Sequence, residues 1–212
     1  MDDITYRNLK LSTKLPFSLI NVELNAGSKD SEQFERLSQI KENIVDFVKN
    51  GKCLYIGSHN SGNGKTSWAT ILGKEYFDKS IINASLRIRG GEVVKPVFYI
   101  NVPDYLALRK NAIGNYDMQM KLREYEYNIA TAKLVIFDDI SDVQASDYDN
   151  NYLYSWINTR IENGYSCIFT SNAETEEELL EIYQPKLIDR IFNNSIVVTM
   201  RSGSRRWKNS TY

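Results

Sequence analysis

The segment from Ser58 to Ser67 carries the residue types that hold a phosphate group. It reads Ser-His-Asn-Ser-Gly-Asn-Gly-Lys-Thr-Ser and lies between the apolar run 53–56 and a stretch typical of a helix. At the start of a helix, free backbone N–H groups and the helix dipole both favour an anion. Lys65 would reach the β- and γ-phosphates of a nucleotide, and the Thr66 hydroxyl would bind Mg²⁺. We therefore expect a phosphate-binding loop formed by Ser61, Gly62, Asn63, Gly64, Lys65, Thr66 and Ser67.

His59 departs from the full pattern of such a loop, which has a glycine at this position. The pattern alone leaves two interpretations open, a nucleotide site and an ordinary glycine-containing turn. The apolar run before the loop and the helical stretch after it favour the nucleotide site, because this context is what gives the motif its meaning.

Two carboxylates, Asp138 and Asp139, would supply the second half of the site. They follow the continuous apolar run 134–137, which is typical of a parallel strand buried on both faces. Open α/β sheets bind ligands at the carboxyl ends of their strands. Asp138 is the candidate Mg²⁺ ligand, through water, since Mg²⁺ keeps several of its waters. Asp139 is the candidate that orients or polarises the attacking water. The alternative is that the two acids cap the next helix.

Asn172 and two arginines are further candidates. Asn172 stands at the end of the apolar run 166–170, so its amide could touch the γ-phosphate or the attacking water, or it could cap the following helix. Arg160 and Arg190 each lie inside a patterned helical segment. Arginine stabilises the charge on a transferring phosphoryl group, often from a neighbouring molecule, although a solvated or salt-bridged arginine is the default.

The chain ends in a small basic cluster with one aromatic residue. This cluster could contact nucleic-acid phosphates while the indole stacks on a base, or it could be a solubilising terminus. A second basic stretch, with Arg87 and Arg89, lies in the polar connection 80–95. The members of the terminal cluster are Arg201, Arg205, Arg206, Trp207 and Lys208.

Composition limits the remaining possibilities. The 26 basic and 27 acidic residues nearly cancel, so any contact with nucleic acid must be a local patch. The two cysteines lie in apolar runs and are expected to be small buried hydrophobes in a reducing compartment. A single histidine argues against a His-based zinc site or a Ser-His-Asp triad. We find no signal peptide and no apolar run long enough to span a membrane, so we expect a cytoplasmic protein with no membrane contact.

Strand and helix patterns alternate along the chain. This alternation predicts an α/β fold with a mostly parallel five-stranded sheet flanked by helices. Residues 1–30 are expected to be a short N-terminal segment that could contact a partner, and 31–212 an ATPase-like core with a basic tail. The expected strands are 53–56, 97–101, 134–137, 166–170 and 195–200. The expected helices are 34–48, 65–77, 117–131, 147–163, 175–183 and 185–192, with a helix entry at 102–104.

Four segments, in order, resemble the DnaC/DnaI/IstB group of AAA+ ATPases. They are the loop ending Gly-Asn-Gly-Lys-Thr (62–66), Phe-Tyr-Ile-Asn-Val-Pro-Asp-Tyr-Leu (98–106), Val-Ile-Phe-Asp-Asp-Ile (135–140), and Ile-Asn-Thr-Arg (157–160) continuing to Thr-Ser-Asn (170–172). The resemblance covers roughly residues 34–206. It implies an AAA+ P-loop core, with a reduced or absent C-terminal lid, that binds ATP and Mg²⁺.

The resemblance also implies roles for individual residues. Lys65 and Thr66 would be the Walker A pair, Asp138 and Asp139 the Walker B pair, and Asn172 the first sensor. Among the arginines, Arg190 matches the finger that reaches the adjoining subunit and so implies a homo-oligomer. Arg206, or else Arg205, matches the second sensor, and Arg160 matches an arginine at the subunit contact.

The group includes loaders of replicative helicases, which implies a phage or mobile-element protein that loads or remodels such a helicase on single-stranded DNA. Loaders also carry an N-terminal domain that grips the helicase, whereas only about thirty residues precede the core here. Two alternatives stay open. One is an IstB-like helper of a transposase, and the other is a nucleotide-switched binding module with little turnover, which His59 makes conceivable.

Overall fold

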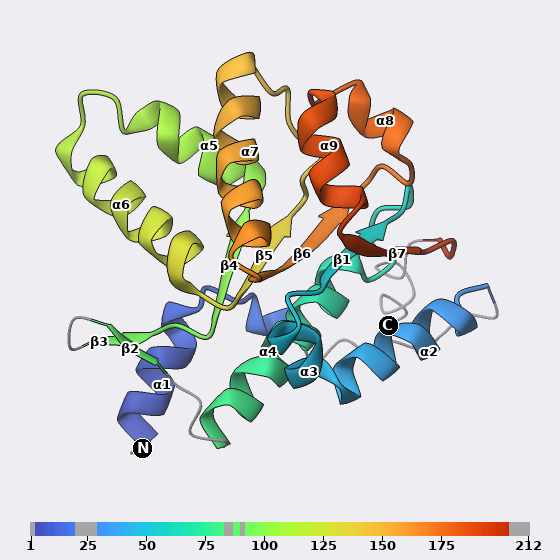
Figure 1. Ribbon diagram of the computed structural model, residues 1–212, viewed down its shortest axis with the longest axis horizontal. Helices are drawn as coiled ribbons and strands as arrows, with labels where there is room; N and C mark the ends of the chain where they lie inside the picture. The colour runs from blue at the N-terminus through green and yellow to red at the C-terminus, as the bar shows by residue number, and fades with distance from the viewer. Residues whose placement is uncertain (1–2, 20–28, 83–86, 90–91, 204–212) are drawn as a thin grey trace, which may run out of the picture.

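A parallel β-sheet forms the centre of the computed structural model, which describes residues 3–19, 29–82, 87–89 and 92–203 (Figure 1). Its strand order is β4-β5-β6-β1-β7, and each neighbouring pair runs parallel. The strands are β1 (Cys53–Gly57), β4 (Val97–Asn101), β5 (Leu134–Asp138), β6 (Ser166–Ser171) and β7 (Ser195–Thr199). The predicted five-stranded α/β fold is therefore confirmed.

Helices cover both faces of this sheet (Figure 1). One layer contains α1 (Asp3–Ser12), the short 3₁₀ helix η1 (Phe17–Leu19), α2 (Ser31–Glu42), α3 (Ile44–Lys49) and α4 (Lys65–Ile82). The other contains α5 (Val102–Asn111), α6 (Tyr116–Thr131), α7 (Asp147–Glu162), α8 (Glu176–Leu180) and α9 (Pro185–Phe192). None of the helices in the described ranges is both long and apolar enough to cross a membrane.

Two hydrophobic cores result from the alternation of side chains along the strands. In β5, Leu134 and Ile136 face the core under α2, α3 and α4, whereas Val135 and Phe137 face the core under α5, α6, α7 and α9. Because a side chain at 138 continues the first set, Asp138 lies on the α4 face of the sheet. The sheet therefore presents the carboxylate to the same side as the helix that follows the glycine-containing loop.

Three local elements differ from the sequence-based expectation. The expected helix 34–48 is two helices, interrupted at Asn43, whose side chain donates to the Gln39 carbonyl and so competes with the helical backbone. The polar connection 80–95 contains an antiparallel pair, β2 (Arg87–Arg89) and β3 (Glu92–Val94). The Gly-Gly dipeptide between these strands is a known hairpin signal. Helix α1 was not expected.

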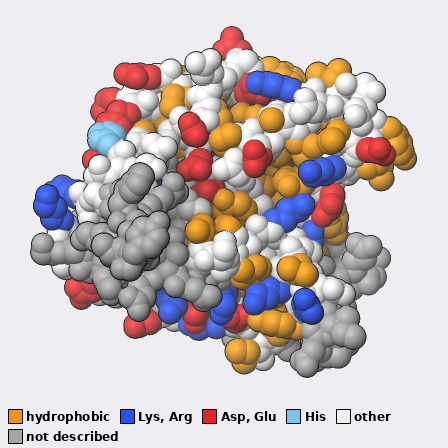
Figure 2. All heavy atoms as spheres, turned by 180° about the vertical axis from the view of Figure 1, so that it is seen from behind, with side chains coloured by type: hydrophobic (Ala, Val, Ile, Leu, Met, Phe, Trp, Pro, Cys, Tyr) orange, Lys and Arg blue, Asp and Glu red, His pale blue; other side chains and the backbone are white. Residues whose placement is uncertain are grey.

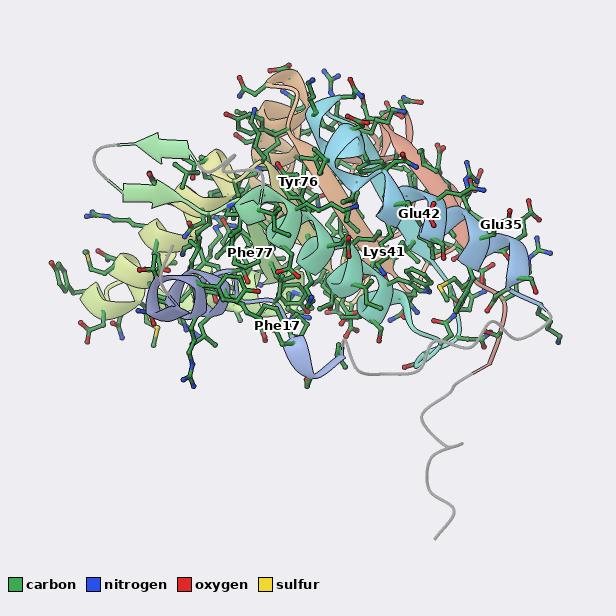
Figure 3. All side chains as sticks on the ribbon, turned by 90° about the horizontal axis from the view of Figure 1, so that it is seen from below. Phe17, Glu35, Lys41, Glu42, Tyr76 and Phe77 are labelled. Carbon is green, nitrogen blue, oxygen red and sulfur yellow. The ribbon has the colours of Figure 1, made fainter. Side chains whose placement is uncertain are left out.

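The N-terminal segment packs against the core. Tyr6 contacts Phe77 with ring centroids 5.7 Å apart, and the Tyr6 hydroxyl donates to Asp78 at 2.9 Å. Phe17 belongs to the same cluster, and in Figure 3 it lies close to Phe77 where η1 meets α4. Beyond α1, the Thr13 carbonyl accepts a hydrogen bond of 2.9 Å from the backbone of Tyr99 on the edge strand β4. The role of residues 1–30 in partner contact stays a prediction.

Arg160 is not at a subunit contact, and that prediction is wrong. The side chain is 1% exposed and lies beneath α7, where it donates to four main-chain carbonyls and to the Cys167 sulfur. The carbonyls belong to Ile129, Ala132, Lys133 and Ser166. Every N–H of the guanidinium group therefore meets an acceptor inside the protein. Cys53 and Cys167 are both buried free thiols, as expected.

Candidate active site

The loop between β1 and α4 has the shape that its glycines permit. Strand β1 ends at Gly57, and α4 begins at Lys65, so the seven residues between them turn the chain from strand to helix. Gly62 and Gly64 have φ angles of 76° and 106°, in the left-handed region that side chains disfavour. The expected strand, glycine turn and helix are therefore present in this order.

Lys65 lies inside this loop. Lys65 is only 5% exposed, and its ammonium group donates to the carbonyls of Ser58 and Asn60, each at 3.1 Å. Asn63 is fully buried and donates to the Ser58 hydroxyl at 2.6 Å, while its Oδ1 atom has no hydrogen-bond partner within the described residues. The loop thus surrounds a buried positive charge, which fits it for an anion such as a phosphate.

Strand β6 joins this loop to the two carboxylates, since it lies between β1 and β5. The Ser58 N–H donates to the Ser171 carbonyl at 3.1 Å, and the Ile140 N–H donates to the Thr170 carbonyl at 2.9 Å. Consecutive residues at the end of β6 therefore bind the start of the loop on one side and the chain just after Asp139 on the other. The structure places Lys65, Thr66, Asp138 and Asp139 together at the carboxyl ends of the strands.

Asp138 is held by hydroxyl groups from the strands on its two sides. Asp138 is only 2% exposed. Its Oδ1 atom accepts a hydrogen bond from the Thr170 hydroxyl at 2.5 Å, and its Oδ2 atom accepts one from the Tyr99 hydroxyl at 2.7 Å. Burial first, and then the charge of Asp138, raise the pKa of the Tyr99 hydroxyl, so it stays protonated and donates. Together with the Thr66 hydroxyl, this carboxylate offers the oxygen donors that Mg²⁺ prefers.

Asp139 has an uncommon backbone conformation. Its φ angle is 55°, which few residues other than glycine adopt, although Asp and Asn tolerate it better than most. Its N–H donates to the Thr170 hydroxyl at 3.0 Å, and its Oδ2 accepts from Asn101 at 3.3 Å. Such conformations persist where surrounding contacts impose them, and they concentrate at functional sites.

The alternative prediction, that Asp138, Asp139 and Asn172 cap the helices that follow them, is wrong. Helix α7 is capped by Ser146, in a reciprocal capping box with Asp149, and α8 is capped by Thr175. Asn172 is exposed immediately after β6, and its N–H donates to the Ser141 hydroxyl at 2.7 Å. It therefore lies at the same edge as the phosphate loop, where its amide is available to a ligand.

Arg190 is not part of this cluster. Arg190 is half-buried in the last turn of α9, next to the amino end of β7, whereas the cluster lies at the carboxyl ends of the strands. Among the described residues, none forms an ion pair with Arg190. Arg205, Arg206, Trp207 and Lys208 lie outside the described residues.

His59 ties the loop to the segment after β6. Its N–H donates to Glu174 at 3.1 Å, and its ring Nε2 lies 2.8 Å from both carboxylate oxygens of Glu178. The hydrogen bond to Glu178, and then the charges of Glu174 and Glu178, raise the pKa of His59 despite the opposing effects of partial desolvation and of Lys65. Figure 2 shows the histidine at the surface with acidic side chains beside it. The residue that breaks the loop pattern thus has a specific carboxylate partner.

Tyr99, Asn101 and Thr170 contact the carboxylates but were not assigned a role from the sequence. All three lie in segments that carry the family resemblance, so a signal was present. Their contact with Asp138 and Asp139 depends on strand order and register, in which Asn101 pairs with Asp138 and Phe137 with Phe169. A single sequence does not give that register.

Comparisons with known proteins agree with this architecture. No family model matches the chain. A curated sequence, the chromosomal replication initiator protein DnaA of Mesoplasma florum, is 26% identical over 125 residues, which are 59% of this chain. The match covers 26% of that protein, so the chain spans about a quarter of the length of this relative.

Solved structures match over most of the chain. The DnaC helicase loader superimposes with a TM-score of 0.65 at 16% identity, covering 87% of this chain and 99% of that one. DnaI gives 0.65 at 17% identity, covering 88% and 94%. The replication initiator DnaA bound to AMPPCP and single-stranded DNA gives 0.61 at 15% identity, covering 86% and 51%. The chain therefore has the AAA+ fold that the domains of DnaC, DnaI and DnaA share.

Proposed function

We propose that this protein is an ATP-binding and ATP-hydrolysing AAA+ protein of DNA replication. The observation that carries the proposal is the end of β6, which hydrogen-bonds both the start of the Lys65 loop and the chain after Asp138 and Asp139. This arrangement places a buried cation and two carboxylates at one edge of a parallel sheet, where α/β proteins bind nucleotides. The DnaA structure with AMPPCP shows that the same fold holds a nucleotide in another protein.

Each residue at this edge has a role in the proposed reaction. Lys65 would hold the β- and γ-phosphates, and the backbone and side chains of residues 61–67 would surround them. Thr66 and Asp138, the latter through water, would hold Mg²⁺, which neutralises phosphate charge when bound. Asp139 would orient the attacking water, and the Asn172 amide would contact that water or the γ-phosphate. Arg206 would be a second phosphate sensor.

Arg190 would act on the nucleotide of a neighbouring copy. It stands at the opposite end of the strands from the phosphate loop of its own chain, and it has no ion pair among the described residues. An arginine supplied by a partner can stabilise the charge that develops on a transferring phosphoryl group. The protein would therefore hydrolyse ATP as a homo-oligomer.

The proposed partners are a replicative DNA helicase and single-stranded DNA. Support comes from the likeness to the solved chain of the DnaC helicase loader, 99% of which is covered, and from the DnaA structure with single-stranded DNA. We propose that ATP binding and hydrolysis drive the loading or remodelling of the helicase.

Nucleotide binding and hydrolysis test the core of this proposal. Lys65→Ala should weaken the binding of a fluorescent ATP analogue at least tenfold, because the positive charge in the loop is lost. Lys74→Ala is the matched control: Lys74 lies on the same helix but pairs with Asp78 at 2.6 Å. Asp139→Asn should bind the analogue normally and lose hydrolysis. Failure of the wild-type protein to bind ATP with Mg²⁺ would overturn the proposal.

Assembly is tested separately. Arg190→Ala should bind ATP like the wild-type protein but hydrolyse it at least tenfold more slowly, and mixing it with Asp139→Asn should restore part of the activity at mixed interfaces. Lys186→Ala, on the same helix, is the control, since Lys186 contacts only Asn151 and the Tyr154 ring among the described residues. Equal loss of nucleotide binding in Arg190→Ala would contradict action from a neighbouring copy.

The partner is tested with the replicative helicase encoded in the same genome. The wild-type protein with ATP should increase the amount of helicase bound to single-stranded DNA, and Lys65→Ala should not. Capture of a transposase in place of the helicase would favour the transposition helper. A wild-type protein that binds ATP without hydrolysing it would instead be a nucleotide-switched module. His59, which replaces a glycine of the loop pattern, is the feature that makes this alternative conceivable.

A further inference from the structure

We propose that Tyr99 is a positioning residue for Asp138. Its hydroxyl fixes the carboxylate in the orientation that receives Mg²⁺. This inference rests on the proposed function, since it assigns Tyr99 to the metal side of the same site. Tyr99 itself would touch neither the metal nor the nucleotide.

Asp138 is supported symmetrically by the two neighbouring strands. This residue ends the strand β5, and each neighbouring strand contributes one hydroxyl to one carboxylate oxygen: Thr170 of β6 to Oδ1 at 2.5 Å and Tyr99 of β4 to Oδ2 at 2.7 Å. A carboxylate held at only one oxygen can rotate about its terminal bond. With both oxygens held, the plane of the group is fixed.

The two hydroxyl contacts leave the Asp138 carboxylate with acceptor capacity for the metal. An ionised carboxylate has about four lone-pair sites, and the two hydroxyls take two of them. The remaining sites can accept hydrogen bonds from waters of a Mg²⁺ ion, which requires nearly ideal octahedral geometry. Groups that orient such a ligand set typically change metal affinity 10- to 100-fold when removed.

Tyr99 is anchored from outside the sheet. Its backbone N–H donates to the Thr13 carbonyl at 2.9 Å. Leu15, two residues after Thr13, packs against α4. Gly73 makes this close packing possible: a Cβ there would lie 3.0 Å from a Leu15 methyl group. The N-terminal segment therefore fixes the strand position from which Tyr99 reaches Asp138.

The test is the Mg²⁺ dependence of nucleotide binding in Tyr99→Phe, which removes only the hydroxyl. In EDTA this variant should bind a fluorescent ATP analogue within twofold of the wild-type affinity. The Mg²⁺ concentration that gives half of the metal-induced change in fluorescence should rise about tenfold. Tyr6→Phe is the matched control, because it removes another tyrosine-to-aspartate hydrogen bond, of 2.9 Å to Asp78, on the same side of the sheet.

Each outcome separates this inference from the proposed function. A wild-type protein that does not bind the analogue refutes the proposed function itself. A wild-type protein that binds it, with a Tyr99→Phe variant of the same Mg²⁺ requirement, overturns the role of Tyr99. A variant that loses affinity equally in EDTA and in Mg²⁺ shows a general structural defect, which also overturns a role in positioning the carboxylate.

Discussion

The two halves of the candidate site are built in different ways. The phosphate loop is one continuous segment, whose lysine binds carbonyls five and seven residues away and whose His59 forms exposed contacts with Glu174 and Glu178. The carboxylate half draws on three strands, and Tyr99 and Thr170 meet Asp138 from 39 and 32 residues away in sequence. The phosphate half is formed mainly by contacts within residues 58–65 and carries the exposed His59, whereas the carboxylate half joins residues distant in sequence around the buried Asp138.

This difference indicates where the site is robust and where it is fragile. Exposed ion pairs contribute little to stability and respond to pH and salt. Buried polar groups are costly when one partner is removed, because the remaining group cannot recover its hydration. We therefore expect substitutions in the carboxylate half to lower the stability of the fold, and those around His59 to alter the loop without unfolding the protein.

Replacing Arg160 should have the largest effect. Arg160 binds carbonyls at the amino ends of β5 and β6, the strands that carry Asp138 and Thr170. Arg160→Met would leave several buried carbonyls without these donors, and should lower the free energy of unfolding by about 3 kcal/mol or more. Urea denaturation measures this change. Arg123→Met, at an exposed position on α6, should stay within about 0.5 kcal/mol of the wild type.

Replacing Thr170 should have an intermediate effect. Its hydroxyl donates to Asp138 and accepts from the Asp139 N–H, so Thr170→Val removes two hydrogen bonds at nearly constant volume. The free energy of unfolding should fall by about 1–3 kcal/mol. In Thr131→Val the lost hydroxyl donates at 2.7 Å to a carbonyl of its own helix, and a loss below about 1 kcal/mol is expected. Equal losses in the two variants would show that the hydrogen bonds of Thr170 stabilise the fold no more than one within a single helix.

Titration of His59 should show the smallest effect on stability and the clearest dependence on pH. The pKa of His59 is raised above its ordinary 6.5, and that of Glu178 is lowered below its ordinary 4.5, by a backbone N–H and by His59. The His59 contribution is complete below pH 6.5 and is lost as pH rises through the raised pKa. The Glu178 contribution is complete above pH 4.5 and is lost as pH falls through the lowered pKa. The pair is therefore fully formed between these two values.

This titration is measurable without ambiguity, because the sequence contains one histidine. The ring resonances in a proton NMR titration should give a pKa above 6.5 in the wild type and a lower value in Glu178→Gln. Glu177→Gln is the control, since Glu177 is a neighbouring acid whose carboxylate accepts from its own backbone N–H and from the Thr175 hydroxyl. An unchanged histidine pKa in Glu178→Gln would show that the loop is not tied to α8 in solution.

The same contrast explains what the sequence could and could not predict. The loop and the acid pair are contiguous motifs, so their residue types and order were sufficient to find them. Tyr99 and Thr170 become partners of Asp138 only through strand order and register, which lie beyond local patterns. Arg160 was misplaced for a related reason, since nothing in its helical segment indicates that four carbonyls converge on it. Helix α1 is only partly buried, through Tyr6 and Leu9, and six of its ten residues are polar or charged.

Each outer strand of the sheet has a backbone group that another part of the chain already binds. At one edge the Thr13 carbonyl occupies the backbone N–H of Tyr99, and at the other the Arg36 side chain occupies the Val197 carbonyl at 3.2 Å. Exposed strand edges are templates for pairing with further strands, and such contacts block them. Another chain would have to displace Thr13 or Arg36 before it could extend the sheet. The two contacts therefore disfavour growth into β-linked aggregates at Tyr99 and at Val197.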